Sequence, residues 1–304
     1  MIFIKNAGFF ILSCILLSIL IPLCVVITKN KPEREERIII KLEKEDNSIV
    51  EIPLEEYVLC VLRREVPALY EEEALKAQAV AIRSYALRKT ESNTHEKGDL
   101  CTLFSHCMAY MDEEEAKEKW GEKFYEYNEK MKKAVSDTQN KVLFYENQIA
   151  NTVFFALSSG RTEDAADVWG GKVPYLVSVD SIEDVNAKGF ESEVKVSAAE
   201  FKNKLKLESV NIESVTRTEG GSVKKIRISG KDFEGKDIRS IFGLRSANFE
   251  ISSGEEIVFK VKGYGHGVGM SQNGANENAK NGMNFEEILA KYYPGTQLVD
   301  LFEK

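Results

Sequence analysis

Glu65 is the first residue whose type and position could do chemistry. It falls on the side of a short segment where apolar residues recur at helical spacing: Leu54, Val58, Val61 and Leu62. A carboxyl group in apolar surroundings has a raised pKa, which suits a general acid near neutral pH. The alternative is a glutamate that pairs with Arg63 or Arg64, or that is exposed at a fraying helix end. The pattern alone favours this alternative.

His95, Cys101 and Cys107 follow one another at intervals of six residues in a polar, irregular segment. Three such ligands can wrap one tetrahedral Zn²⁺, with water or a fourth side chain completing the shell. His106 is a competing ligand, although its adjacency to Cys107 makes simultaneous binding by both awkward. Two unpaired thiols, or a Cys101–Cys107 disulfide if the domain faces an oxidising exterior, remain open alternatives. The other cysteines do not extend this cluster into a disulfide framework.

A glycine-rich stretch, GYGHGVGMSQNGA, surrounds His266 between Gly263 and Ala275. Glycines let the backbone approach a ligand closely or take positive φ. A dinucleotide site is weakly supported because no βαβ unit with an acidic residue surrounds the stretch, and a phosphate loop would need Gly-Lys-Ser/Thr. The remaining interpretations are a ligand site and a structural loop with a buried His266.

The segment SSGRTEDAADVWGGKVPYLVSV places Trp169 and Tyr175 among polar donors. Aromatic side chains beside hydroxyl and charged groups suit a sugar ring, which has an apolar face and polar edges. Core packing of both aromatics is the safer interpretation. A nucleophile at Ser158 or Ser159 would need His and Asp partners that the sequence does not identify.

The elements that must position these residues predict an α+β fold. Helices are expected at 55–66, 72–89, 113–135 and 284–292, and strands at 38–54 with a turn at Asp46-Asn47. A hairpin should turn at Glu146-Asn147. Short strands and one helix at 192–261 predict a smaller strand-rich subdomain beside a mixed α/β catalytic core.

The first thirty residues predict a cytoplasmic tip and a membrane anchor, followed by a charged tether at 31–37 and one domain at 38–304. Residues 7–28 carry no charge and, as a helix of about 33 Å, could cross a bilayer. A cleaved signal peptide is the alternative, although we find no small-x-small site before Lys29. The positive charges flanking the span do not favour an external C-terminal domain. A net charge of −8 makes nucleic acid an unexpected partner.

Several long blocks, in this order, resemble the stage II sporulation protein D family, which also includes amidase-enhancer proteins. They are EEYVLCVLRREVPALYEEEALKAQAVAIRSYAL, CTLFSHCMAY, SSGRTEDAADVWGGKVPYLVSV, LRSANFEI and GYGHGVGMSQNGANENAKNGMNFEEILAKYYPGT. The resemblance covers nearly everything from Ile38 to Phe302. It implies a membrane-anchored peptidoglycan lytic transglycosylase that faces the cell wall.

The resemblance also implies roles for individual residues. Glu65 matches the family's catalytic glutamate, and Arg83 and Tyr175 match residues that position the substrate. The cleft would also include the substrate-binding residues Ser159, Trp169, His266 and Gln272. Some clostridial members resemble this chain at His95, Cys101 and Cys107, which implies a zinc ion of structural rather than catalytic use.

The implied substrate is the MurNAc–GlcNAc bond of glycan strands already stripped of stem peptides. The implied partners are an amidase of the stage II sporulation protein P type and a membrane scaffold, acting in the sporulation septum and during engulfment. A non-catalytic wall-binding amidase enhancer and a zinc hydrolase are the alternatives. Three positions depart from the family pattern: Arg63 and Arg64 precede the glutamate, Val177 replaces a common lysine, and Asn273 replaces a common aromatic.

Overall fold

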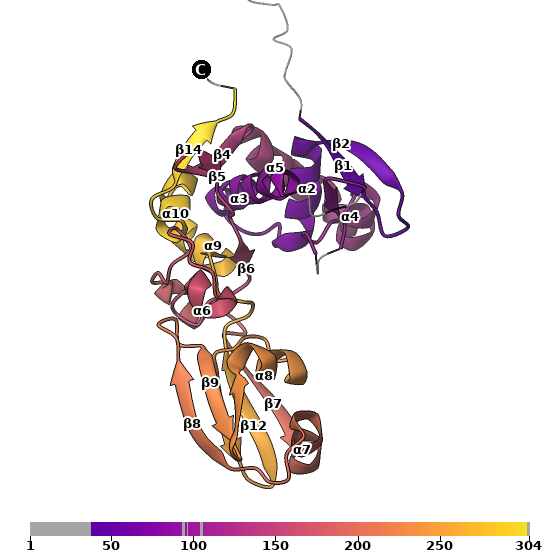
Figure 1. Ribbon diagram of the computed structural model, residues 1–304. Coiled ribbons are helices and arrows are strands. Elements are labelled where there is room, and N and C mark those ends of the chain that lie inside the picture. The colour runs from indigo at the N-terminus through magenta and orange to yellow at the C-terminus, as the bar shows by residue number, and fades with distance from the viewer. Residues whose placement is uncertain (1–37, 93–94, 96, 104–105, 303–304) are drawn as a thin grey trace, which may run out of the picture. The chain divides into compact units, whose positions relative to one another are not determined.

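The computed structural model describes residues 38–92, 95, 97–103 and 106–302 (Figure 1). Residues Ile39–Lys304 form one compact unit. The span expected at 7–28 and the tether at 31–37 lie outside the described residues. Among the residues that are described, no helix is both long enough and apolar enough to cross a membrane.

The chain begins with the predicted hairpin. Strands β1 (Ile39–Glu43) and β2 (Ile49–Pro53) pair antiparallel, and Asn47 takes the left-handed conformation in the turn between them, with φ of 62°. Asparagine tolerates this conformation better than most residues. A two-residue strand, β3 (Leu100–Cys101), pairs parallel with β1. The metal-ligand candidate Cys101 is therefore tied to the hairpin through β3.

Helix α2 (Leu54–Glu65) follows β2 without a loop, as predicted. It ends at Val66, which is extended because the next residue is Pro67. Glu65 is therefore the last residue of the helix. The buried side chains of α2 include those of the predicted apolar side: Leu54, Val58, Val61 and Leu62.

Helix α3 (Glu72–Glu91) is the centre of the larger core. Its alanines are almost all fully buried, and it packs against α2, α5, α9, α10 and β4. Small side chains allow this many neighbours to approach one helix closely. The helix predicted at 72–89 is confirmed.

The helix predicted for 113–135 is wrong as a single element. The structure has α4 (Glu113–Trp120), a 3₁₀ turn η1 (Gly121–Lys123) and α5 (Phe124–Asp137). Gly121 has φ of 52°, which breaks the helical hydrogen-bond ladder. The sequence periodicity continues through this break, so the pattern did not reveal it.

The hairpin at Glu146-Asn147 is confirmed, although its second strand is short. Strand β4 (Lys141–Tyr145) pairs with β5 (Gln148–Ile149) and with the C-terminal strand β14 (Gln297–Asp300). The predicted C-terminal helix is α10 (Phe285–Tyr292), whose N-terminus is held by a capping box on Asn284.

The glycine-rich stretch contains β13 (Met270–Ser271), which pairs parallel with β6 (Phe154–Phe155), a short strand just before the SSGRTE segment. A short helix α6 (Ala165–Trp169) and a 3₁₀ turn η2 (Ile182–Asn186) follow β6, and helix α9 (Gln272–Lys280) follows β13. The sequence predicted a loop where α9 begins.

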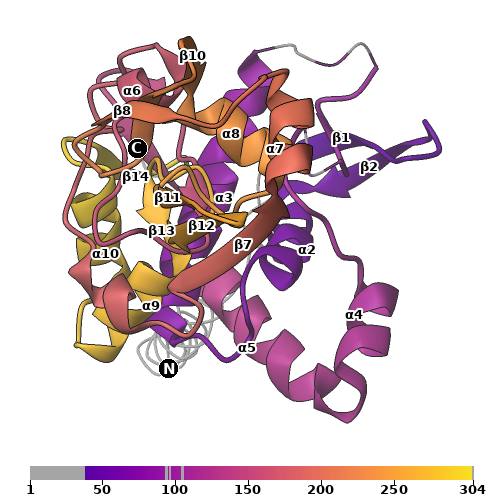
Figure 2. The ribbon, with the colours of Figure 1, turned by 90° about the horizontal axis from the view of Figure 1, so that it is seen from below.

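The segment from β7 (Glu191–Ser197) to β12 (Glu256–Lys262) consists of strands and short helices (Figures 1 and 2). It encloses a hydrophobic core of its own, which includes Phe201, Phe242, Phe249 and Phe259. Two antiparallel three-stranded sheets surround it, in the orders β10-β9-β8 and β11-β12-β7. The remaining elements are α7 (Ala198–Leu205), β8 (Ile212–Arg217), β9 (Val223–Ile228), β10 (Lys231–Glu234), α8 (Gly235–Phe242) and β11 (Phe249–Ser253).

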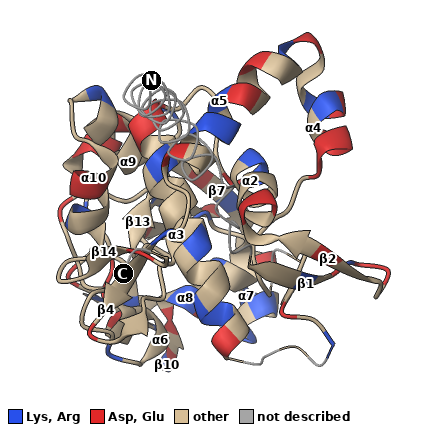
Figure 3. Ribbon diagram, turned by 90° about the horizontal axis from the view of Figure 1, so that it is seen from above, with Lys and Arg blue, Asp and Glu red and all other residues tan. Residues whose placement is uncertain are grey.

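Helix α7 was predicted, whereas α8 was not. The fold class is α+β with several small sheets. Charged side chains of both signs are interspersed along α4, α5 and α10, a pattern typical of solvated helix faces (Figure 3).

Candidate functional site

The carboxyl of Glu65 is partly buried at the end of α2, and its Oε1 accepts a hydrogen bond of 2.9 Å from the backbone N–H of Ala109. Burial raises the pKa of this carboxyl. The hydrogen bond from Ala109, the Gln272 side chain and the charge of Arg64 offset only part of the effect. A raised pKa keeps a larger fraction of the acid protonated near neutral pH. The geometry can therefore supply a general acid.

The two arginines before Glu65 do not neutralise it. Arg63 is 3% exposed, and its Nε and Nη2 donate hydrogen bonds of 3.0 and 2.6 Å to Oδ1 of Asn128 on α5. Its side chain is thus held by α5, whereas the charge of the exposed Arg64 lowers the pKa of Glu65 less than burial raises it. The pKa of Glu65 therefore stays raised despite this departure from the family pattern.

Two further polar groups surround the carboxyl. Gln272, the first residue of α9, is buried and adjoins Glu65, but its Nε2 makes no hydrogen bond of normal geometry among the described residues. The Tyr57 hydroxyl, about two turns back on α2, is likewise buried without such a partner among the described residues. Gln272 thus lies beside Glu65, and its amide N–H groups are available to a ligand.

His95, Cys101, His106 and Cys107 bring four ligand atoms within 4.8 Å of one another. The Sγ atom of Cys107 lies 3.2 Å from Nε2 of His95 and 3.7 Å from Nδ1 of His106, and Sγ of Cys101 lies 3.6 Å from the same Nδ1. A tetrahedral zinc with bonds of normal length separates its ligand atoms by about 3.3–3.8 Å. The donor set and its spacing therefore fit zinc.

His106 differs from what the sequence suggested. Adjacency to Cys107 made simultaneous binding by both look awkward, yet the ligand atoms of both lie within the cluster, although His106 is itself exposed. The backbone N–H groups of both residues donate to the carbonyl of Leu103, which makes a tight turn. Cys101 and Cys107 are both free thiols, so the alternative of a disulfide is not what the structure contains.

Arg83 is fully buried and lies in the core rather than on a ligand-binding surface. Its Nε and Nη2 donate bonds of 2.8 and 2.6 Å to the carboxylate of Glu55, and Nη1 donates to the carbonyl of Lys141 at 3.0 Å. The arginine joins α3, α2 and β4. This placement gives no support to the prediction that Arg83 contacts substrate.

Tyr175 is also buried. Its hydroxyl accepts a hydrogen bond of 2.7 Å from the backbone N–H of Asn151, and its ring lies 5.1 Å from that of Tyr145. It lines a hollow with Arg88, Tyr145 and the β4–β5 turn, a set that does not include Glu65. The structure does not bring Tyr175 and the acid together.

Trp169 and His266 do lie together. The Trp169 side chain is 49% exposed, and its ring centroid is 5.2 Å from that of His266. Burial and the charge of Arg239 lower the pKa of His266 to about 4, so the imidazole is neutral at physiological pH. Its Nδ1 accepts a hydrogen bond from the backbone N–H of Val268. The pair joins two motifs that are about a hundred residues apart in sequence.

The serines have structural hydrogen bonds. The Ser159 hydroxyl donates to the carbonyl of Gly220 at 3.1 Å and lines a groove of the strand-rich segment with Arg161. The Ser158 hydroxyl donates to the carbonyl of Ser181 and is buried. Neither hydroxyl is hydrogen-bonded to a histidine, as a nucleophile of the serine type would require.

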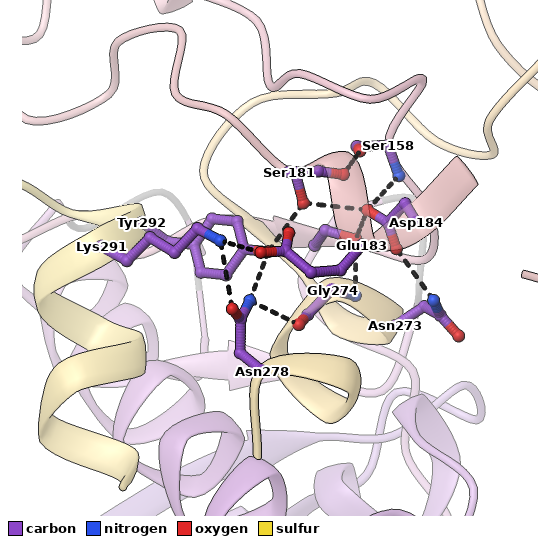
Figure 4. A network of polar contacts seen from close by, with 10 residues as sticks. Ser158, Ser181, Glu183, Asp184, Asn273, Gly274, Asn278, Lys291 and Tyr292 are labelled. Atoms are coloured by element: carbon purple, nitrogen blue, oxygen red, sulfur yellow. Dashed lines mark hydrogen bonds and ion pairs between the residues drawn. The ribbon is translucent and has the colours of Figure 1, made fainter. Parts of the chain in front are cut away.

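Asp184 is a residue that the sequence analysis missed. It is fully buried, and its Oδ2 accepts hydrogen bonds from the Ser158 N–H at 3.1 Å and from the hydroxyls of Ser181 and Ser271 at 3.0 and 2.7 Å (Figure 4). Its Oδ1 accepts from Asn273 at 2.9 Å. The carboxylate thus fixes the start of α9, including Gln272, to the segment around β6. It also explains why an asparagine serves at position 273.

Comparison with known proteins identifies the family of the chain. Residues 43–145, which include Glu65 and the four metal-ligand candidates, match a family model described as stage II sporulation protein. Stage II sporulation protein D of Bacillus subtilis (strain 168) is 40% identical over 261 residues, covering 83% of this chain and 76% of that protein. The protein of the same name in Bacillus amyloliquefaciens is 38% identical over the same shares.

A weaker similarity leads to the amidase enhancer of Bacillus subtilis (strain 168), which is 26% identical over 297 residues. That match covers 78% of this chain but 39% of the enhancer. The identity and coverage of the sporulation proteins are high enough to assign a family. This chain belongs to the sporulation-related stage II sporulation protein D family and is related to an amidase enhancer.

Proposed function

We propose that this protein is a peptidoglycan lytic transglycosylase whose catalytic acid and base is Glu65. The observation that carries the proposal is the state of that one carboxyl. Burial raises its pKa, a backbone N–H fixes one of its oxygens, and the neighbouring Arg63 is turned away and paired with Asn128. These are the properties of a proton donor that works near neutral pH.

The proposed reaction needs one carboxyl group. Protonated Glu65 gives its proton to the glycosidic oxygen between MurNAc and GlcNAc, and the bond from that oxygen to C1 of MurNAc breaks. The resulting carboxylate accepts the proton of the C6 hydroxyl of the same MurNAc, and O6 bonds to C1. The products are a 1,6-anhydro-MurNAc end and a free GlcNAc hydroxyl, and Glu65 is protonated again.

The surroundings of Glu65 support this choice over hydrolysis by two carboxylates. None of the groups that shift the pKa of Glu65 is a second carboxylate. Most glycoside hydrolases hold two carboxyl groups about 5–9.5 Å apart. Because attack by O6 is intramolecular, positioning of the sugar supplies much of the acceleration. Gln272, with its free amide N–H, is suited to hold the sugar beside the acid.

The four-residue cluster would hold a zinc ion through His95, Cys101, His106 and Cys107. When bound, zinc supplies a structural cross-link, since four protein ligands leave no open position for a substrate. The cross-linked segment leads directly to Ala109, which holds Glu65. This segment would thus hold the Glu65 carboxyl in place through the Ala109 N–H.

We further propose the cellular setting. Residues 7–28 anchor the chain in the cell membrane with the C-terminal domain outside the cytoplasm, at the sporulation septum and the engulfing membrane. The substrate is glycan from which an amidase has removed the stem peptides, and the partners are such an amidase, of the stage II sporulation protein P type, and a membrane scaffold. This setting rests on family membership and on the uncharged stretch in the sequence.

The test is to incubate the protein with peptide-free glycan strands and to analyse the products by mass spectrometry. We expect 1,6-anhydro-MurNAc ends from the wild-type chain and none from Glu65→Gln. Glu56→Gln is the matched control, because Glu56 lies on the same helix but is exposed. Equal cleavage by wild type and Glu65→Gln would refute the assignment.

The similarity to an amidase enhancer favours a second candidate, a non-catalytic glycan-binding protein that stimulates an amidase. In that case the wild-type chain leaves peptide-free strands intact and accelerates release of stem peptides by a cell-wall amidase. Glu65→Gln would then stimulate the amidase as well as the wild type does.

A further inference from the structure

Arg239 on α8 is a cation without a partner. Its side chain is partly buried, and in the part of the chain that the structure describes it forms neither an ion pair nor a side-chain hydrogen bond. Burial lowers its pKa, and Tyr264 is its titratable neighbour. A guanidinium that loses hydration without gaining a carboxylate costs folding free energy. Such a group is expected where a ligand supplies the missing anion.

The pocket around Arg239 carries one uncompensated charge. Its lining includes two lysines and two carboxylates besides Arg239 and His266. The lysines are already paired, Lys224 with Asp167 at 2.7 Å and Lys236 with Glu234 at 2.8 Å. His266 is neutral at physiological pH. The net charge left for a ligand is therefore the positive charge of Arg239.

Aromatic surface adjoins this charge. His266 and Val168 line the same pocket as Arg239, and the ring of Trp169 lies 5.2 Å from that of His266. Trp169 and Tyr264 are each 49% exposed, which is unusual for such large side chains. An exposed aromatic face suits the apolar face of a sugar ring, and a guanidinium binds a carboxylate through two parallel hydrogen bonds.

We propose that Arg239 and Trp169 form a subsite for a MurNAc residue whose lactyl carboxylate is free. Trp169 contacts the sugar ring, and Arg239 binds the carboxylate. The inference rests on the proposed function and adds the reason for its substrate preference. A stem peptide converts this carboxylate into an amide, which has no charge and continues into a bulky chain. Removal of the stem peptide by an amidase restores the free lactyl carboxylate, which can pair with Arg239.

The test measures binding to the Glu65→Gln chain, which should not cleave its ligand. The probes are a GlcNAc–MurNAc tetrasaccharide with free lactyl carboxylates, the same compound with those groups as methyl amides, and a version with L-alanine attached. We expect the free acid to bind about tenfold to a hundredfold more tightly than the amide. The L-alanine compound should bind like the amide, because its carboxylate is displaced from the ring.

Arg239→Gln, added to the Glu65→Gln chain, should bind all three compounds equally, whereas Arg239→Lys should keep part of the preference. Arg227→Gln is the matched control, because Arg227 is an exposed arginine on β9 that already pairs with Glu213 and Asp232. The melting temperature of the Arg239→Gln chain should not fall, since the guanidinium has no partner in the protein.

Three results would overturn the subsite. The Glu65→Gln chain could show no preference for the free acid, it could bind none of the compounds, or the preference could survive Arg239→Gln. The two proposals fail separately. Cleavage without discrimination between the probes refutes the subsite and leaves the transglycosylase in place. Discrimination without cleavage by the wild-type chain refutes the transglycosylase and leaves the subsite.

Discussion

The backbone N–H of Ala109 donates a hydrogen bond of 2.9 Å to Oε1 of Glu65, so a segment 44 residues further along the chain holds the proposed acid. Ala109 comes two residues after Cys107. The N–H of Met111 also donates to the carbonyl of Cys60 on the same helix as Glu65. The segment that carries the four metal-ligand candidates is thus fastened to α2 at two points. A metal ion that orders the cluster would therefore also order Ala109, whose N–H donates to Glu65.

Removal of metal should therefore affect both stability and activity. We expect the purified protein to contain one zinc per chain, and chelation to lower the melting temperature and the cleavage rate together. Cys101→Ser should do the same. Cys60→Ser is the control, because Cys60 is a buried free cysteine outside the cluster. Elemental analysis measures the zinc content, thermal unfolding the melting temperature, and mass spectrometry of the products the cleavage rate. An unchanged melting temperature after complete chelation would contradict a structural zinc.

Replacement of the acid should stabilise the fold at neutral pH. The folded state keeps the Glu65 proton at a pH where the unfolded chain has lost it, because burial raises the folded pKa above the ordinary value of 4.5. Stability therefore falls as the pH rises from about that value through the raised pKa. Glu65→Gln removes this dependence and keeps an oxygen to accept from Ala109.

The free energy of unfolding of Glu65→Gln should thus exceed that of the wild type above the raised pKa, and the difference should vanish below 4.5. Denaturant unfolding at a series of pH values measures it. A Glu65→Gln chain that is less stable than the wild type at neutral pH would show that Glu65 is ionised and favourably paired in the fold.

Arg83 and Glu55 should behave as a structural pair. Because Arg83 is fully buried, Glu55→Gln leaves its charge without an anion, and we expect a loss of about 3 kcal/mol in the free energy of unfolding. A double-mutant cycle with Arg83→Met measures the coupling. If Arg83 instead contacted substrate, Arg83→Met would change the apparent substrate affinity while Glu55→Gln would not.

Asp184→Asn should destabilise the protein by about 2 kcal/mol or more, because an amide NH₂ group would face donors where a carboxylate now accepts four hydrogen bonds. The change should also loosen the start of α9 and so weaken substrate binding at Gln272. Thermal unfolding and the Michaelis constant for peptide-free glycan measure the two effects. Wild-type values for both would mean that the network does not position α9.

The sequence predicted those parts of the fold whose signals are local. Apolar residues at helical spacing predicted α2, and Pro67 marked the end of that helix. Turn residues marked the two hairpins. Helix α9 was missed because Gly274 looked like part of a flexible loop. In the structure a side chain at that position would collide with the Tyr292 hydroxyl, so the glycine permits close packing.

The site depended on contacts between distant residues, which a single sequence does not reveal. The direction of Arg63 is set by Asn128, which is 65 residues away in the sequence. The partnership of Arg83 with Glu55 likewise spans 28 residues. The spacing of His95, Cys101 and Cys107 suggested a metal site, but the turn at Leu103 that brings in His106 became visible only in the structure.

The most direct test of the central claim is the source of the oxygen at the new MurNAc end. Peptide-free glycan is cleaved in water enriched in oxygen-18, and the ends are analysed by mass spectrometry, with Glu65→Gln as the inactive control. Intramolecular attack by O6 predicts ends that lack the elements of one water and carry no label. Reducing MurNAc ends that contain the heavy isotope would show that water attacks C1, and would contradict the transglycosylase mechanism.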